Sequence, residues 1–178
     1  YETIDFHIGT AVGANRQVIG QPVPFWRCPS DVAPSHISSE FFDGDRVAVA
    51  TGNFCGVQPV LEEMSHVRLR DVTDGLSQTL FLGERIYQPS ELGSPEFTSS
   101  WIGQVATATE MVNHSIPHLE ATSHNPINIS PACHRCFTSY HQGGAQFAFG
   151  DGSTRLLSES IDLDVYEALA TPNGGEAV

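Results

Sequence analysis

Short apolar runs separated by turn-forming residues dominate the pattern along the chain. The longest run, residues 79–86, is nearly continuous, which is typical of a strand buried in the middle of a sheet. The Asp74-Gly75 pair just before it predicts a turn. Two further segments, 47–51 and 99–105, predict additional strands. The chain is therefore expected to build much of its core from short strands.

The clearest local pattern is a hairpin, in which two short alternating segments flank Asp151-Gly152. Asp-Gly readily adopts the two positive φ angles of a type I′ turn, so we expect a two-residue loop. Such a loop sets the pairs Gly150–Ser153, Phe149–Thr154, Ala148–Arg155 and Phe147–Leu156. Because alternate residues share a face, the side chains expected to be buried together are Phe147, Phe149, Thr154 and Leu156.

A short amphipathic helix is predicted after the hairpin, so that residues 141–170 form a hairpin followed by a helix. Apolar residues recur at positions 161, 165 and 169, and acidic residues occupy the first turn. Ser160 is the candidate N-cap, and the helix is expected to end before Pro172.

Long loops are expected between these elements. Residues 1–46 contain four prolines, which restrict φ and remove backbone donors, so regular structure there should be short. Phe25 and Trp26 are expected to pack this entry segment onto the core. Residues 107–135 mix His, Pro, Asn and Ser without a period and predict a long surface loop. Together the elements predict an α+β fold with an antiparallel sheet, long loops and a short C-terminal helix.

Length and charge limit the function classes. The 178 residues suit a single domain spanning 1–178. Its eight basic residues are all arginine and are scattered, against 21 acidic residues and a net charge of −13. Nucleic-acid binding needs clustered positive charge, so no nucleic-acid partner is expected. No apolar run reaches the roughly 18 residues of a membrane span, and the start at Tyr1 indicates a mature product or a fragment.

The cysteines allow several kinds of chemistry. Cys28, Cys55, Cys133 and Cys136 permit three disulfide pairings in an oxidising compartment and none in a reducing one. Cys133 and Cys136 have the C-x2-C spacing of a local disulfide, of redox motifs and of half a zinc site, which His118, His124 or His141 could complete. A local disulfide or thiols are favoured over metal here, and Cys28 with Cys55 is then the natural second pair.

Four segments carry a recognisable combination of motifs. One is a His-x(9)-Asp-Gly motif formed by His141, Asp151 and Gly152. The others are Cys-Pro-Ser-Asp at 28–31, Asp-Gly-x-Ser-x-Thr…Gly-Glu from Asp74 to Glu84, and Leu-Ala-Thr…Gly-Gly-Glu at 169–176. In order and spacing these segments resemble a large family of bacterial prepilin-like proteins, similar to type II secretion pseudopilins.

The resemblance implies a location and an architecture rather than a reaction. It implies a pilin-like globular head, exposed in the periplasm or at the cell surface and attached to the membrane by an N-terminal hydrophobic helix that this chain lacks. It also implies partners that are other protein subunits, either copies of the same chain or a membrane-associated complex. No biochemical activity comes with the family.

Catalytic chemistry is not the favoured interpretation of the motif residues. A strand over 145–150 would separate His141 from Asp151 by about 20 Å, so the two are not expected to form a dyad. Asp74, Gly75, Asp151 and Gly152 are interpreted as turn residues, and Gly143 and Gly144 as a flexible pair after His141. Glu84 is expected to lie near the sheet in a structural ion pair with Arg85, Arg155 or His141.

The sequence therefore predicts a non-catalytic subunit that acts by assembly or surface contact, with no cofactor and no metal site. The turn acids Asp43, Asp45, Asp71 and Asp74 match no calcium loop and are expected to be solvated. Two alternatives remain open. A periplasmic module that binds a small ligand or metal would show a concave polar pocket near the histidine-rich loop. An envelope hydrolase would bring His141, Glu84 and a third polar group together around a cleft.

Overall fold

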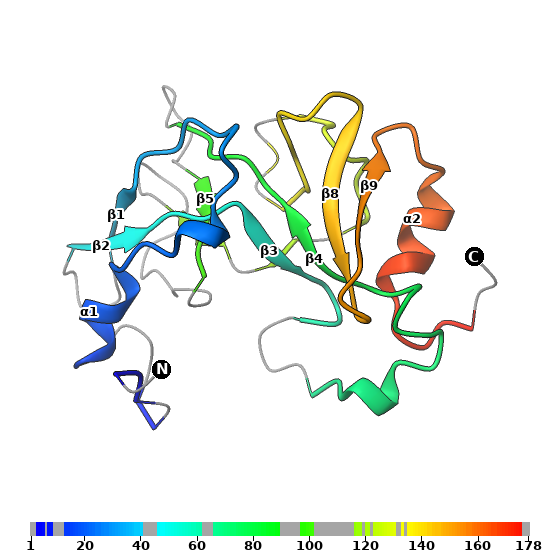
Figure 1. Ribbon diagram of the computed structural model, residues 1–178, viewed down its shortest axis with the longest axis horizontal. Helices are drawn as coiled ribbons and strands as arrows, with labels where there is room; N and C mark the ends of the chain where they lie inside the picture. The colour runs from blue at the N-terminus through cyan, green and yellow to red at the C-terminus, as the bar shows by residue number, and fades with distance from the viewer. Residues whose placement is uncertain are drawn as a thin grey trace. The chain divides into compact units, whose positions relative to one another are not determined.

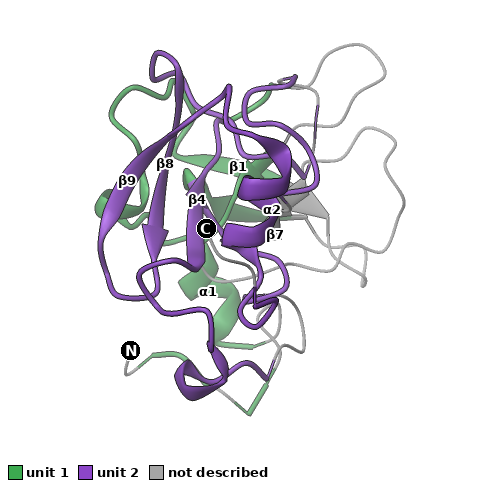
Figure 2. Cartoon of the chain, turned by 90° about the vertical axis from the view of Figure 1, so that its right-hand side faces the viewer, with its two compact units in different colours: residues 1–53, 87–119 green, residues 54–86, 120–178 purple. Residues whose placement is uncertain are grey.

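The computed structural model divides the chain into two compact units, which Figure 2 colours separately. Unit 1 comprises residues 1–53 and 87–119, and unit 2 comprises residues 54–86 and 120–178. The single domain expected from the sequence stays a prediction. The residues that the structure describes are 3–5, 7–8, 13–40, 46–61, 66–89, 97–101, 116–118, 120–121, 123–130, 133 and 135–175.

Unit 1 contains two small two-stranded sheets. Strands β1 (His36–Glu40) and β2 (Arg46–Ala50) pair antiparallel, and β5 (Phe97–Ser99) pairs parallel with β6 (Ile116–His118). The helix α1 (Asn15–Ile19) and the 3-10 turn η1 (Pro24–Trp26) precede them. Among its described residues, Ile19, Ile37 and Val49 form a small buried core, against which Val47 and Tyr87 pack.

Unit 2 is built on a five-stranded sheet in the order β7-β3-β4-β8-β9, followed by the helix α2 (Figure 1). Its neighbours pair antiparallel, except that β7 runs parallel to β3. The α+β class with mainly antiparallel sheets is confirmed, as is the central position of the strand at 79–86. The bounds are β3 Phe54–Val57, η2 Leu69–Asp71, β4 Leu80–Glu84, β7 Glu120–Ala121, β8 Gly144–Phe149, β9 Thr154–Ser158 and α2 Leu163–Ala170.

The core of unit 2 lies between the sheet and α2. Phe147 is central, with its ring 5.0 Å from that of Phe137 and 5.8 Å from that of Tyr166, both in edge-to-face geometry. The Phe137 ring also lies over Gly83, where a Cβ atom would come within 2.3 Å of it. Leu169 joins the same cluster, so α2 is held by its buried side chains.

The predicted hairpin forms, but its predicted register is wrong by one residue. The observed pairs are Ala148–Thr154, Phe147–Arg155, Gln146–Leu156, Ala145–Leu157 and Gly144–Ser158. Gly152 N donates to Phe149 O and Phe149 N donates to Ser153 O, so the loop holds three residues. Only Gly152 in this loop has a positive φ, +84°, as in a type I turn followed by a left-handed residue.

The shift moves every β9 side chain to the opposite face. Thr154 and Leu156, expected inside, are exposed, while Leu157 packs against the core. Arg155 shares the face of Phe149, with its guanidinium 4.3 Å from the ring centroid, and donates to Ser77 O at 3.2 Å. This position explains why an arginine is tolerated on the inner face: the side chain lies over the Phe149 ring while remaining accessible to solvent.

The predicted helix also forms, with corrections at its start and on its face. Asp162 rather than Ser160 is the N-cap, since its carboxylate accepts from Asp164 N and Val165 N. The buried face is made by Tyr166, Leu169 and Ala170, so Val165 is exposed instead of buried. No helix in the described ranges is both long enough and apolar enough to cross a bilayer.

Three expectations about loops need correction. Phe25 is 81% exposed and does not pack into a core, whereas Trp26 packs against Gly52. The segment 107–135 is not loop throughout, since it contains β6 and β7. The strand expected over 99–105 overlaps β5 only at Ser99, and residues 102–105 lie outside the described residues.

Candidate functional site

Glu84 at the end of β4 organises the group of motif residues that the sequence singled out. Its carboxylate is 2% exposed and accepts hydrogen bonds from the Ser139 hydroxyl at 2.8 Å and from Gln146 N at 3.1 Å, both on Oε2. His141 Nε2 lies 3.4 Å from the other oxygen, Oε1. Of the three partners expected for Glu84, His141 is therefore the one that lies beside the carboxylate. The contact joins a buried carboxylate to a partly exposed ring.

Backbone pairing carries Ser139 and His141 to this position. Thr138 N donates to Glu84 O at 3.0 Å, and Ile86 N donates to the Thr138 hydroxyl at 3.2 Å. The segment after Phe137 is therefore tied by hydrogen bonds to the end of β4 and to the residues that follow it. Ser139 Oγ also accepts from His141 N at 3.0 Å, which fixes the two residues to each other.

Asn128 supports this segment from the preceding loop, and sequence reasoning missed it. Its backbone has a φ of +60°, a conformation that asparagine tolerates better than most residues. Its side-chain oxygen accepts from Ser139 N at 2.8 Å, and its amide nitrogen donates to Glu159 Oε2 at 3.0 Å. No local pattern identifies this role, because both partners are distant in sequence.

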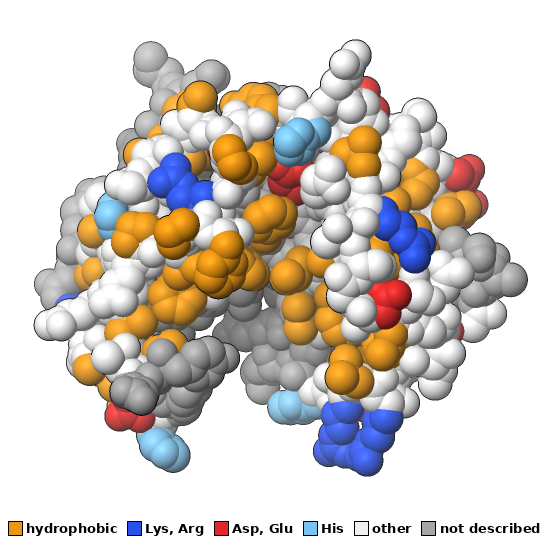
Figure 3. Space-filling model, viewed as in Figure 1, with side chains coloured by type: hydrophobic (Ala, Val, Ile, Leu, Met, Phe, Trp, Pro, Cys, Tyr) orange, Lys and Arg blue, Asp and Glu red, His pale blue; other side chains and the backbone are white. Residues whose placement is uncertain are grey.

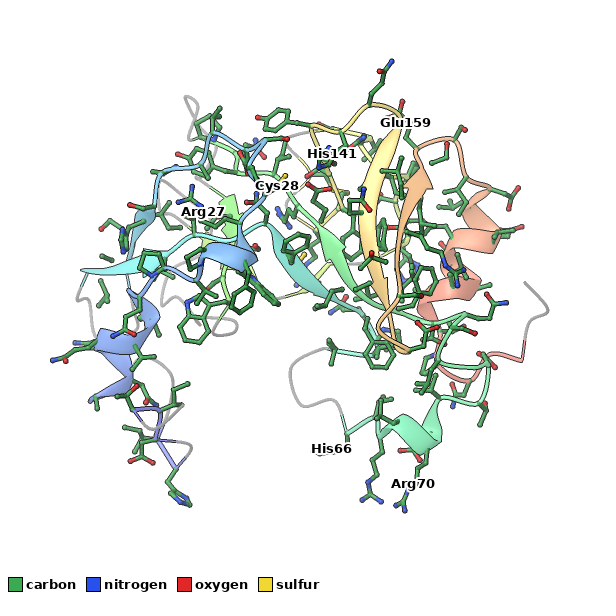
Figure 4. All side chains as sticks on the ribbon, in the orientation of Figure 1. Arg27, Cys28, His66, Arg70, His141 and Glu159 are labelled. Atoms are coloured by element: carbon green, nitrogen blue, oxygen red, sulfur yellow. A yellow bond between two sulfur atoms is a disulfide. The ribbon has the colours of Figure 1, made fainter. Side chains whose placement is uncertain are left out.

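The glycines after His141 close the same end of the sheet. Gly143 has a φ of +82°, and its carbonyl accepts from Glu159 N at 2.9 Å. At Gly144 a Cβ atom would lie 1.9 Å from Leu157 O, so close strand approach excludes any side chain. Gly144 is thus required by packing, whereas Gly143 is favoured by its left-handed backbone conformation. Figure 4 shows His141 and Glu159 near one another at this end.

A shallow groove of about 410 Å³ opens beside this group. Tyr140, His141, Asn128 and Glu159 contribute to its lining. Three polar side chains, those of Glu84, Ser139 and His141, therefore converge, as the hydrolase alternative required. Their order, however, differs from that of a nucleophile relay: the Ser139 hydroxyl donates to the carboxylate, so it is not activated by the imidazole.

The other end of the His-x(9)-Asp-Gly motif makes separate, local contacts. Asp151 accepts from Ser153 N at 2.9 Å and donates from its own backbone to Leu76 O at 3.1 Å. The hydrogen bonds from Ser153 lower the pKa of this exposed carboxyl group. Asp151 and Gly152 therefore act as the turn residues that the sequence predicts.

Asp74 connects two of the motifs across the chain. Its carboxylate accepts from Gly174 N at 2.7 Å and from Gly175 N at 3.0 Å. Thr73 N donates to Pro172 O at 2.8 Å in the same region. Asp74 is thus more than the solvated turn acid expected from the sequence, because it holds the C-terminal segment against the Gly75 turn, where φ is +99°.

The cysteines resolve one of the open pairings. Cys133 and Cys136 form a disulfide, so neither offers a thiolate to zinc. The second expected pair is not formed, since Cys28 and Cys55 belong to no disulfide within the described chain. Cys55 is fully buried in the unit 2 core, with its thiol 3.9 Å from Gly83 O.

Arg85 directly follows Glu84, the last residue of β4, is buried and makes a different contact. It donates to Cys133 O at 3.4 Å, and burial lowers its pKa to about 10. It therefore stays charged at neutral pH. The expected turn acids Asp43 and Asp45 lie outside the described residues.

Comparison with known proteins gives one match. The family described as "Protein of unknown function (DUF1559)" matches residues 1–164 of the chain. No curated protein and no solved structure matches it.

Proposed function

The chain belongs to the DUF1559 family, and from this premise we propose that it is a non-catalytic, pilin-like subunit that acts through protein contacts at the cell envelope. Its partners are copies of itself or a membrane-associated complex. Attachment to the membrane through an N-terminal helix, which the resemblance to prepilin-like proteins implies, is part of the proposal.

The use of Glu84 is the observation that carries the non-catalytic part. A catalytic acid or base must reach a substrate, whereas this carboxylate is buried and accepts from two donors of its own fold. The side chain joins β4, β8 and the Ser139 segment, which is the role of a structural anchor. In this proposal the motif residues stabilise the fold, and surface residues make the functional contacts.

Exposed apolar side chains of unit 2 support a contact function. Ile129 is 54% exposed, Tyr140 is 53% exposed and Leu156 is 47% exposed. Leu156 lies on β9, which ends the sheet, and edge strands offer backbone groups to a partner. The Cys133–Cys136 disulfide supports an oxidising location such as the periplasm or the cell surface.

Photo-crosslinking in the native cell tests this proposal. A photo-reactive residue is placed at Tyr140 or Leu156 of the full-length protein, with the exposed Thr73 as the matched control position. We expect crosslinks to other proteins from the first two positions and not from the third. The same crosslinks are expected in a His141→Ala background.

Two results together would overturn the proposal. One is an absence of protein crosslinks from both positions. The other is a hydrolytic activity that disappears in folded His141→Ala protein while its stability is unchanged.

A small-ligand binding module is the second candidate, favoured by the polar groove that Tyr140, His141 and Glu159 help to line. Native mass spectrometry of protein purified from its own cells distinguishes it. A stoichiometric small molecule that His141→Ala releases would favour this role, whereas protein without such a molecule favours protein contacts.

A further inference from the structure

The segment around η2 presents arginine on a protein with a large negative charge. Arg68, Leu69 and Arg70 are consecutive and exposed, and Leu69 is 63% exposed although it is apolar. The neighbouring carboxylate of Asp71 already has local partners: it accepts a hydrogen bond from Arg68 N at 2.9 Å and lies 3.9 Å from the Arg70 guanidinium. Figure 3 shows the arginines of this segment as a basic patch at the lower edge of unit 2, and Figure 4 shows Arg70 projecting outward.

We call residues 68–70 the arginine tip. Leu69, between the two arginines, leaves most of its apolar side chain accessible to a partner. Arginine pairs with carboxylates through a rigid set of donors and tolerates partial desolvation better than lysine. The tip is therefore suited to an acidic groove with an apolar floor.

Unit 2 also carries a groove of that kind beside α2. Its volume is about 550 Å³, and Asp164 and Glu167 of α2 contribute carboxylates to its lining. Pro59 and Ala168 give it apolar surface. His124 Nδ1 lies 3.2 Å from Glu167 Oε1, a contact on one of the two carboxylate oxygens. We call this the α2 groove.

We propose that the arginine tip of one copy docks into the α2 groove of a second copy. Leu69 would pack against Pro59 and Ala168, and the guanidinium groups would pair with Asp164 and Glu167. Two copies with a net charge of −13 each repel one another overall, so a local complementary pair of patches decides where they can meet. This inference rests on the proposed contact function and names its partner.

The geometry of such a contact determines the kind of assembly. The tip and the groove are different surfaces of the same unit, so a copy that docks its tip still offers its own groove. Contacts of this heterologous kind give rings or open chains rather than closed symmetric dimers. The protein is therefore expected to form oligomers whose size grows with concentration.

Charge exchange tests the contact. The variants are Arg68→Glu with Arg70→Glu at the tip, and Asp164→Arg with Glu167→Arg at the groove. In sedimentation at low salt, we expect either variant alone to weaken association by roughly tenfold. A chain carrying both changes restores the pairing and should recover association. Arg135→Glu, at an exposed arginine elsewhere in unit 2, is the control for a charge reversal outside both patches and should associate like the native protein.

Mixing separates this contact from nonspecific attraction. The tip variant retains a working groove, and the groove variant retains a working tip. The exchanged tip of one variant also complements the exchanged groove of the other, so an equimolar mixture should associate like the native protein, while each variant alone associates more weakly.

Failure of the inference and failure of the proposed function give different results. Association that persists in the tip variant, or no association of the native protein up to millimolar concentration, overturns the tip-and-groove contact. If crosslinks to other proteins from Tyr140 or Leu156 persist in that case, the contact function stands with a different partner. If the native protein does not self-associate through the tip and the crosslinks are also absent, both the tip-and-groove contact and the proposed contact function are overturned.

Discussion

Carboxylates occur in two contrasting regions of unit 2, the buried end of β4 and the exposed side of α2. Glu84 accepts hydrogen bonds from the Ser139 hydroxyl and Gln146 N of its own chain, and the His141 ring lies 3.4 Å away. Asp164 and Glu167 instead line an open groove. The same chemical group thus has different roles, since a buried charge requires satisfaction by the fold and an exposed one can serve a partner.

The contrast shows where function is to be sought. The motif residues His141, Gly144 and Glu84 meet at one end of the sheet and hold segments together. The arginine tip belongs to no motif that the sequence singled out, and the carboxylates of the α2 groove, Asp164 and Glu167, belong to none either. Family motifs in this chain therefore describe the frame, and the contacts have to be found on the surface.

The largest expected effect is the loss of the buried anchor. Glu84→Ala removes the acceptor of two hydrogen bonds, leaving the Ser139 hydroxyl and Gln146 N without it. We expect the free energy of unfolding of unit 2 to fall by about 3 kcal/mol. Both tryptophans, Trp26 and Trp101, belong to unit 1, so the measurement has to follow residues of unit 2 itself.

Hydrogen exchange of the β8 amides is the appropriate measurement. Glu159→Ala, which removes an exposed carboxylate at the same end of the sheet, is the matched control and should cost much less. Equal losses for the two variants would remove the distinction between buried and exposed acids.

The second-largest loss of stability is expected at Asp74, a partly exposed acid that anchors the C-terminal segment. Asp74→Ala removes the acceptor for Gly174 N and Gly175 N, so the C-terminal segment loses its attachment. A destabilisation of about 1–2 kcal/mol is expected, with faster exchange confined to residues near 172–175. Thr73→Ala is the neighbouring control. Uniformly faster exchange throughout unit 2 would show that Asp74 acts globally and not as a local clamp.

Tyr166 provides a buried group that the fold does not satisfy. Its hydroxyl is buried and has no hydrogen-bond partner among the described residues, and burial raises its pKa above the ordinary 10.0. Tyr166→Phe is expected to stabilise unit 2 by about 1 kcal/mol at neutral pH, because an unsatisfied polar group is removed.

The pH dependence of this effect has a definite sign. Above pH 10 the unfolded phenol loses its proton while the folded one keeps it, so the tyrosine contribution to stability falls as pH rises. The phenylalanine variant lacks this decline, and its advantage should widen above pH 10. Arg85, whose pKa is lowered, contributes the opposite slope in both proteins and cancels from the difference. A difference that stays constant from pH 7 to 11 would contradict the burial of the phenol.

The smallest effect is expected at His141. Its ring is partly exposed and lies 3.4 Å from Glu84, a distance that marks a modest contact. His141→Ala should lower the free energy of unfolding of unit 2, measured by hydrogen exchange, by less than about 1 kcal/mol. A loss as large as that of Glu84→Ala would mean that the two residues act as one inseparable pair.

The sequence predicted the elements that depend on local pattern. The strand at 79–86, the hairpin and the C-terminal helix all form, because apolar runs and turn residues favour them over short distances. The hairpin register was missed because Gly150-Asp151-Gly152 offers a three-residue loop as well as a two-residue one. One residue in the loop was enough to exchange the faces of Thr154 and Arg155.

The site was predicted less completely. The pairing of Glu84 with His141 was among the expected alternatives, whereas Ser139 and Asn128 were missed. These contacts join residues separated by 55 and 11 positions, and no period in the sequence reports them. The link between Asp74 and Gly174, 100 positions apart, was missed for the same reason.

A double-mutant cycle between Glu84 and Ser139 tests the structural role of the buried carboxylate most directly. Opening free energies of the β8 amides are measured for Glu84→Ala, Ser139→Ala and the double variant. If the carboxylate anchors the Ser139 segment, the two losses are not additive, and the coupling energy is about 1 kcal/mol or more. Losses that add fully, with no coupling, would contradict the account.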